Sequence, residues 1–267
     1  MKKEDMLSRY VEYEKQLEAQ IQRAYEMFKI GKYEDALELV KKAKNFCDET
    51  NNIDLTAMCN RLEGIIYITQ GNVVDGIKKL NEALSIFELN EKYAEVAKIY
   101  NSMASGFAQL SLHTQANMYH SQALAIATKI NDKRVIGFLN LNIAEDYLNM
   151  NQPKNAELYL DNAYKKFAEI NESRMIPPCD YLQGVIFYEN RKYDKAKEMF
   201  DKAITGAEKT NDAHTLSQIY EKYANLNKAE NNLKEEQKNL DLAIICYRKM
   251  NNHKKVMELM ERKQGYK

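Results

Sequence analysis

The 267-residue sequence contains few of the residues that interrupt regular structure or build cofactor sites. It has three prolines, nine glycines and four cysteines, and it has no tryptophan. The glycines are scattered, so no glycine-rich loop could hold a phosphate group. No Cys-x-x-Cys pair occurs, and His113 and His120, seven residues apart, lack the spacing of metal ligands. The sequence therefore predicts neither a cofactor nor a metal site.

Catalytic groups are equally hard to find. No Ser/His/Asp or Cys/His arrangement is supported by its spacing, and no pair of carboxylates stands out among the many acidic residues. We therefore predict that the protein is not an enzyme. A small enzyme or metal protein is the least favoured of three hypotheses considered below.

Charge and hydropathy restrict the partners. The 39 basic and 39 acidic residues balance, whereas a surface for nucleic acid or anionic membrane needs a basic excess. No run approaches the 18 or so apolar residues of a transmembrane helix, and no apolar run follows the first residues as in a signal peptide. We expect a cytoplasmic protein, a monomer or weak homodimer, with its cysteines as buried free thiols: Cys47, Cys59, Cys179 and Cys246.

Small residues recur every forty positions. One set contains only alanine: Ala43, Ala83, Ala123, Ala163, Ala203 and Ala243. A second set lies seven residues earlier: Ala36, Gly76, Ala116, Ala156, Ala196 and Glu236. A third lies nineteen residues before the first: Ala24, Gly64, Ala104, Ala144, Gly184 and Ala224. Such intervals indicate an internal repeat in which two helices approach closely at the same place in every copy.

The residues between these sets predict turns. Gly31, Gly71, Ser111, Asn151, Arg191 or Asn231 separates the third set from the second, and Gly and Asn tolerate a positive φ. Each second helix is followed by an asparagine: Asn51, Asn131, Asn171, Asn211 and Asn251, with Asn90 one place early in the second copy. Each unit is thus helix, turn, helix and loop.

This pattern resembles the tetratricopeptide repeat (TPR). The first unit has Ala24, the large apolar Met27, Gly31, Tyr33 and Ala36, followed by Ala43. The usual period is 34 residues, whereas here it is 40, and the usual Trp and terminal Pro are absent. Longer units look like those of bacterial signalling solenoids, including peptide-pheromone receptors of Gram-positive bacteria. The resemblance implies an all-α fold, a right-handed TPR superhelical solenoid of six helix-turn-helix repeats.

We predict a single solenoid domain over residues 1–267. The repeats span about 16–50, 54–90, 94–130, 134–170, 174–210 and 214–250, preceded by a long helix over residues 3–29 whose early turns cover the open end. A capping helix should follow at about 254–263. Pro177 should force Ile176 out of helical geometry and lengthen its loop. Glu236 breaks its small-residue set, so we expect the last repeat to be the weakest.

The first helices of such a fold line its concave surface. Counting from the third small set, the inward positions include asparagines that can pair with a peptide backbone and aromatic residues that can form pockets. We expect them to face solvent in the free protein. The predicted partner-binding residues are Arg61, Asn101, Asn142, Glu145, Tyr181 and Tyr188.

The first functional hypothesis is a non-catalytic scaffold or regulatory adaptor. It would bind an extended peptide or partner segment in the concave groove. The second is the sensory arm of a longer signalling protein, such as a transcription regulator or cyclic-dinucleotide enzyme, with its output domain beyond residue 267. Some proteins with this architecture carry an N-terminal helical bundle or DNA-binding domain, for which we expect no room before residue 16. The length of the full gene separates the first two hypotheses.

Overall fold

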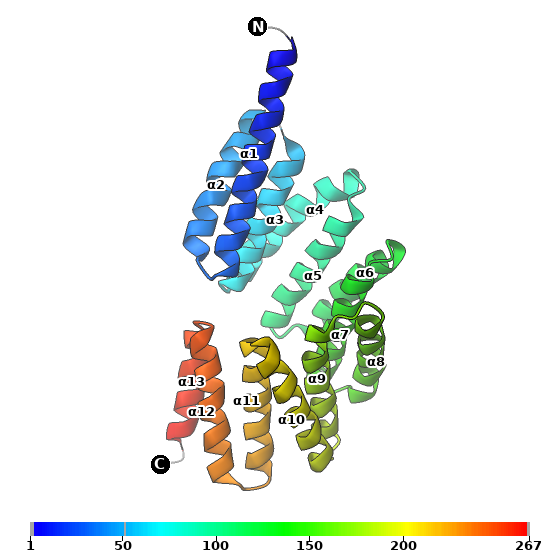
Figure 1. The fold of residues 1–267 in the computed structure, drawn as a ribbon, viewed down its shortest axis with the longest axis vertical. Coiled ribbons are helices and arrows are strands. Elements are labelled where there is room, and N and C mark those ends of the chain that lie inside the picture. The colour runs from blue at the N-terminus through cyan, green and yellow to red at the C-terminus, as the bar shows by residue number, and fades with distance from the viewer. Residues whose placement is uncertain (1–2, 51, 266–267) are drawn as a thin grey trace. The chain divides into compact units, whose positions relative to one another are not determined.

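The computed structural model describes residues 3–50 and 52–265, with side chains described outside 3–11, 13 and 48–50. These residues form helices joined by short turns, and no strand occurs within them (Figure 1). The helices are α1 Lys3–Lys29, α2 Tyr33–Thr50, α3 Ile53–Thr69, α4 Val73–Leu89, α5 Tyr93–Gln109, α6 His113–Lys129, α7 Lys133–Asn149, α8 Pro153–Glu169, α9 Ile176–Glu189, α10 Tyr193–Thr210, α11 Ala213–Ala229, α12 Leu233–Lys249 and α13 His253–Gln264.

The helices form two compact units, residues 1–131 and 132–267. In each unit the first helix of a repeat packs along the second helix of the same repeat, as α3 does on α4 and α9 does on α10. Neighbouring first helices also contact one another: α1 contacts α3 and α3 contacts α5 in the first unit, and α7 contacts α9 and α9 contacts α11 in the second. The prediction of paired helices is confirmed, and the single domain over the whole chain stays a prediction.

The small residues lie where paired helices cross. All six alanines of the first set are fully buried, and the other two sets are buried throughout. The backbones of α3 and α4 approach closely at their crossing, because a Cβ on Gly64 would lie 2.8 Å from the Gly76 carbonyl oxygen. Large buried side chains such as Phe87, Phe167 and Phe200 fill the space beside these crossings.

Overpacking one crossing tests this arrangement in the first unit. Ala123 in α6 is fully buried, so Ala123→Leu has no space for three further carbon atoms. We expect a loss of about 1–3 kcal/mol of unfolding free energy, measured by urea denaturation followed by circular dichroism. Ala125→Leu, at an exposed position of the same helix, is the matched control, and an equal loss there would contradict the assignment.

A left-handed residue sits at each described turn. Its φ lies between 53° and 59° at the non-glycine positions, which are Glu91, Ser111, Asn131, Asn151, Asn171, Arg191, Asn211, Asn231 and Asn251, and is 78° and 86° at Gly31 and Gly71. The assignment of Asn90 was wrong, because Glu91 is the left-handed residue and Asn90 has φ −91°. The twenty-residue interval between turns, rather than the preference of asparagine for positive φ, therefore decides which residue is left-handed here. Asn51 lies outside the described residues.

Side-chain caps begin several helices. Asn52 accepts a hydrogen bond from the Leu55 N–H at 3.1 Å, and Asp132 and Asp212 accept from Val135 and Thr215 at 3.0 Å. These bonds satisfy N–H groups that have no partner within the helix. Asp132 and Asp212 each follow a left-handed residue directly, so a capping carboxylate helps to fix where α7 and α11 start.

The connection after Asn171 is longer than its counterparts, as expected, since α9 begins at Ile176, but Ile176 itself is not distorted. Ile176 has helical φ and ψ of −70° and −45°, and a 3₁₀ turn over Ser173–Met175 leads directly into α9. Proline is compatible with the first turn of a helix, where its missing N–H has no helical partner. The long helix α1 is confirmed, but the contacts of its early side chains lie outside the described residues.

The last repeat contains a buried ion pair where its small-residue set is interrupted. Glu236 is completely buried in α12, and Arg262 of α13 pairs with it, Nη2 to Oε1 at 2.6 Å. The Arg262 Nη1 also donates to Asn225 Oδ1 at 2.7 Å. A carboxylate thus replaces the small residue because it holds the capping helix, which the sequence predicted correctly at 254–263.

The cysteines are free and buried, as predicted. Burial is the main cause of the raised pKa of Cys59, and the neighbouring Cys47 thiol adds to it. Burial likewise raises the pKa of Cys179 and of Cys246. These thiols are therefore protonated at neutral pH and poorly reactive.

Candidate ligand-binding cavity

The predicted site residues fall in both units. Arg61 on α3 and Asn101 on α5 belong to the first unit, whereas Asn142 and Glu145 on α7 and Tyr181 and Tyr188 on α9 belong to the second. Three of the four in the second unit line one cavity, as described next. The grouping of all six into one groove stays a prediction.

A cavity of about 270 Å³ opens between three successive first helices of the second unit, α7, α9 and α11. These helices follow one another side by side in the array (Figure 1). The lining is Phe138, Leu141, Asn142, Glu145, Met175, Pro178, Tyr181, Leu182, Asp212, His214, Thr215 and Gln218. The lining thus combines apolar side chains with an amide, carboxylates and an imidazole.

Tyr181 forms part of the cavity wall, but it does not face solvent as expected. Its exposed fraction is 7%, and its ring lies 6.2 Å from that of Phe200. Phe200 lies on α10, the second helix of the same repeat, and counting along one helix does not reveal this contact. Burial raises the pKa of the Tyr181 hydroxyl well above its ordinary value, and the Glu145 and Glu221 carboxylates add to this. The hydroxyl is therefore neutral and can donate a hydrogen bond.

The cavity lining is acidic. Glu145 and Asp212 supply two carboxylates, and the lining residues include neither Lys nor Arg. Glu145 is exposed, so its carboxylate is accessible to an incoming ligand group. Asp212 accepts hydrogen bonds from the backbone N–H and hydroxyl of Thr215, which fixes its position at the start of α11. A cationic group is the favoured complement of this lining.

The sequence reasoning missed the lining that comes from the start of α11 and from the 3₁₀ turn. Asp212, His214 and Thr215 lie at the start of α11, and Met175 ends the short 3₁₀ helix. Counting from the small residues samples only the middle of each first helix. Asp212 could have been found from its place directly after the left-handed Asn211. A residue at that place begins the next first helix, so its carboxylate lies at the N-terminus of α11.

The remaining predicted residues have other contacts. Arg61 Nε lies 3.2 Å from Glu95 Oε2, so its charge is matched between α3 and α5. Tyr188 packs against Tyr193, with ring centres 5.8 Å apart, and Lys222 Nζ lies 5.8 Å from its ring. Asn101 is half-buried on α5. None of these side chains lines the cavity of the second unit.

Two general properties bear on the kind of site. Within residues 3–50 and 52–265, no helix has the length and apolar composition needed to cross a bilayer. The same described residues contain no cluster of three or more His, Cys, Asp or Glu side chains able to hold a metal ion.

Sequence comparison and structure comparison give different results. No family model matches the sequence, and no curated protein matches it. Solved structures do match. Aspartyl phosphate phosphatase F from Bacillus subtilis has a TM-score of 0.71 at 17% identity, over 99% of this chain and 75% of that one. A Rap protein complexed with competence and sporulation factor has a TM-score of 0.67 at 18% identity, over 91% and 72%.

A third structure carries the repeat by name. The TPR-like repeats of a Podosopora anserina putative kinesin light chain have a TM-score of 0.60 at 15% identity, over 73% of this chain and 96% of that one. At these identities the likeness concerns the fold. The chain therefore has the all-α helical-repeat fold of the tetratricopeptide type that its forty-residue pattern predicts.

Proposed function

We propose that the protein is a non-catalytic, cytoplasmic regulator or adaptor that binds an extended peptide segment through the cavity between α7, α9 and α11. The observation that carries the proposal is the meeting of Asn142, Glu145 and Tyr181 in one acidic, partly apolar cavity. The Rap protein structure with competence and sporulation factor supports it, since a protein of similar fold binds a small factor.

The lining suggests which features of a peptide are recognised. The Asn142 amide offers both a donor and an acceptor, so it suits a peptide main chain whatever its sequence. Glu145 and Asp212 favour a lysine or arginine side chain, while Leu141, Pro178 and Leu182 suit its aliphatic stem or an apolar neighbour. The proposed ligand is therefore an extended segment with at least one basic residue.

Peptide pools test this directly. Fluorescein-labelled hexapeptide pools with one fixed position, either Arg or Glu, are titrated with the full chain and followed by anisotropy. We expect the Arg pool to bind and the Glu pool to bind at least about tenfold more weakly. Asn142→Ala and Glu145→Gln should each weaken the Arg pool by about tenfold, because each leaves a desolvated ligand group without its partner.

Matched controls separate the cavity from the general charge of the chain. Glu157→Gln removes an exposed carboxylate on α8, which does not line the cavity, and should leave binding unchanged. Equal loss in Glu157→Gln and Glu145→Gln, or equal binding of both pools, would refute the proposed recognition. Asn101→Ala then tests the first unit, and a separate loss of affinity would show that the peptide extends to α5.

A further inference from the structure

The capping helix α13 exposes positions that every earlier first helix buries. Met257 has an exposed fraction of 63%. The equivalent residues at intervals of forty are small or compact and all buried: Ala57, Ala97, Gly137, Pro177 and Ser217. The second helix of the same repeat covers them, since a Cβ on Gly137 would lie 2.7 Å from Phe167 and Pro177 packs at Gly206. Within the described residues, no second helix covers α13.

Met260 continues the same surface. It lies three residues after Met257, hence on the same side of the helix, and its exposed fraction is 40%. At the equivalent positions Asn60, Asn140 and Asp180 are buried, Tyr100 and Tyr220 are half-buried, and Gln20 is exposed. Met257 is thus exposed where the repeat normally places a packed helix, Met260 extends its surface, and methionine adapts its shape to varied partners.

Helix α12 adds an apolar residue beside them. Ile245 has an exposed fraction of 48%. The equivalent positions of the other second helices are also exposed, but none carries a large apolar side chain: Asn45, Ser85, Ala125, Lys165 and Thr205. The fold therefore does not require isoleucine at this place, and its presence marks a surface peculiar to the last repeat.

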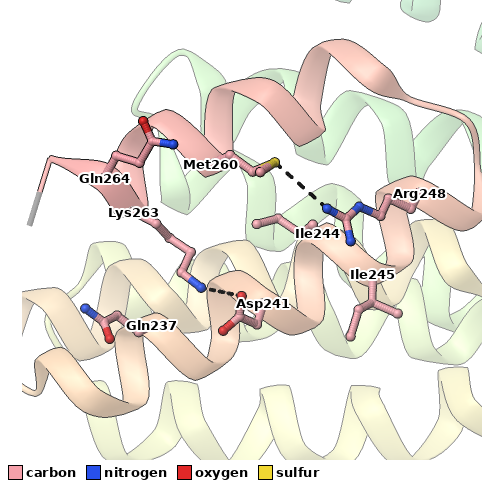
Figure 2. Close-up of a pocket in the computed structure, with 8 residues that line it drawn as sticks. All are labelled: Gln237, Asp241, Ile244, Ile245, Arg248, Met260, Lys263 and Gln264. Atoms are coloured by element: carbon pink, nitrogen blue, oxygen red, sulfur yellow. Dashed lines mark hydrogen bonds and ion pairs between the residues drawn. The ribbon is translucent and has the colours of Figure 1, made fainter.

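A groove joins the two helices. Its volume is about 530 Å³, and it is lined by Gln237, Asp241, Ile244, Ile245, Arg248, Met260, Lys263 and Gln264 (Figure 2). Lys263 is paired with Asp241. Arg248 instead points at Met260, with Nη2 3.9 Å from the sulfur atom, which is its described contact. The groove thus combines apolar side chains with a guanidinium that faces sulfur rather than a carboxylate.

We propose that Ile245, Arg248, Met257 and Met260 form a docking site for an amphipathic α-helix of a partner protein. The partner helix would lie where a second helix covers every earlier first helix, with its apolar stripe on the methionines. A carboxylate beside that stripe would pair with Arg248. A second copy of the chain fits less well, because its own surface would bring another Arg248 to the contact.

Gln264 sets how closely such a helix can approach. It occupies the position of the small residues Ala24, Gly64, Ala104, Ala144, Gly184 and Ala224. Its longer side chain prevents the close crossing found inside the repeats, so the partner helix contacts mainly the Met257–Met260 side. Loose packing of this kind is typical of a reversible interface rather than a permanent one.

A helical probe taken from the chain tests the site. The probe is a labelled peptide of residues 33–50, the sequence of the second helix α2, with Cys47 replaced by serine and a side-chain cross-link that holds it helical. It carries an apolar stripe and five acidic residues, Glu34, Asp35, Glu38, Asp48 and Glu49. We expect saturable binding to the full chain by fluorescence anisotropy, weakened at least tenfold by Met260→Glu and about fivefold by Arg248→Glu.

The controls decide between occupants. Met118→Glu alters an equally exposed methionine of α6 (49%) and should leave probe binding unchanged. A probe with its five acidic residues changed to the corresponding amides should bind more weakly and lose its sensitivity to Arg248→Glu. Absence of saturable binding, or binding that Met260→Glu leaves intact, would overturn the proposal. So would a concentration-dependent dimer in sedimentation that Met260→Glu abolishes, because the occupant would then be a second copy.

Discussion

Arg262→Ala is expected to lower the free energy of unfolding by about 3–5 kcal/mol, the range typical of removing one partner from a buried ion pair. Glu236 is fully buried and the Arg262 side chain is 23% exposed, so solvent cannot replace the lost guanidinium at Glu236. Arg262 also bonds Asn225, so one substitution removes polar contacts of α13 with both α11 and α12. Urea denaturation followed by circular dichroism measures the change.

A second substitution distinguishes the ion pair from general packing. Glu236→Ala restores the alanine that four of the other five repeats have at this position, so adding it to Arg262→Ala should recover most of the lost stability. Lys263→Ala removes the neighbouring ion pair, whose Asp241 side chain is 57% exposed, and should change the free energy by no more than about 1 kcal/mol. A double variant as unstable as Arg262→Ala would show that the buried charge is not the cause.

Gly76→Leu is expected to be the most damaging change in the first unit, with a loss of about 3 kcal/mol. A Cβ at this position would lie 2.6 Å from Ile68 Cγ1 and 2.7 Å from the Gly64 carbonyl oxygen. The backbone oxygen cannot move aside as a side chain can, so α3 and α4 must separate. Thermal and urea denaturation of the purified variant measure the loss.

Gly106→Ala is the matched control for the glycine crossing. It lies in a helix of the same unit, and its Cβ would meet only side-chain atoms of Ile68 and Val73 at 3.2 Å. Those atoms can shift, and alanine favours the helix by up to about 1 kcal/mol, so we expect a change near zero. A large loss at Gly106 together with a small one at Gly76 would refute the account of the crossing.

The repeat explains which parts of the fold could be predicted from the sequence. Six copies of one spacing give the same information six times, so the buried alanines and the capping helix followed directly. Asn90 misled because residue preference favoured it, whereas the twenty-residue register places Glu91 in the left-handed conformation. A side chain in that conformation is held there by two packed helices on either side.

The cavity was only partly predictable. Asn142, Glu145 and Tyr181 were found because they lie on helix faces that spacing defines. The burial of Tyr181 depends on the neighbouring helix, and Asp212 reaches the cavity from a helix start. The ion pair between Glu236 and Arg262 joins α12 to α13. In the sequence, these two helices only look like imperfect copies of the repeat, and nothing there indicates that they are paired. Contacts that differ from repeat to repeat therefore need the structure.

The even spacing of the left-handed residues also limits how the chain can change in length. From Gly31 to Asn251, these residues follow one another every twenty positions wherever the structure describes them. Excising forty residues between equivalent turns leaves the remaining helices at full length and returns each small residue to its crossing. Excising thirty-six instead leaves four extra residues, which lengthen a helix by about one turn and move its alanine away from the partner helix. Folded length variants of this protein should therefore differ from it by whole repeats of forty residues.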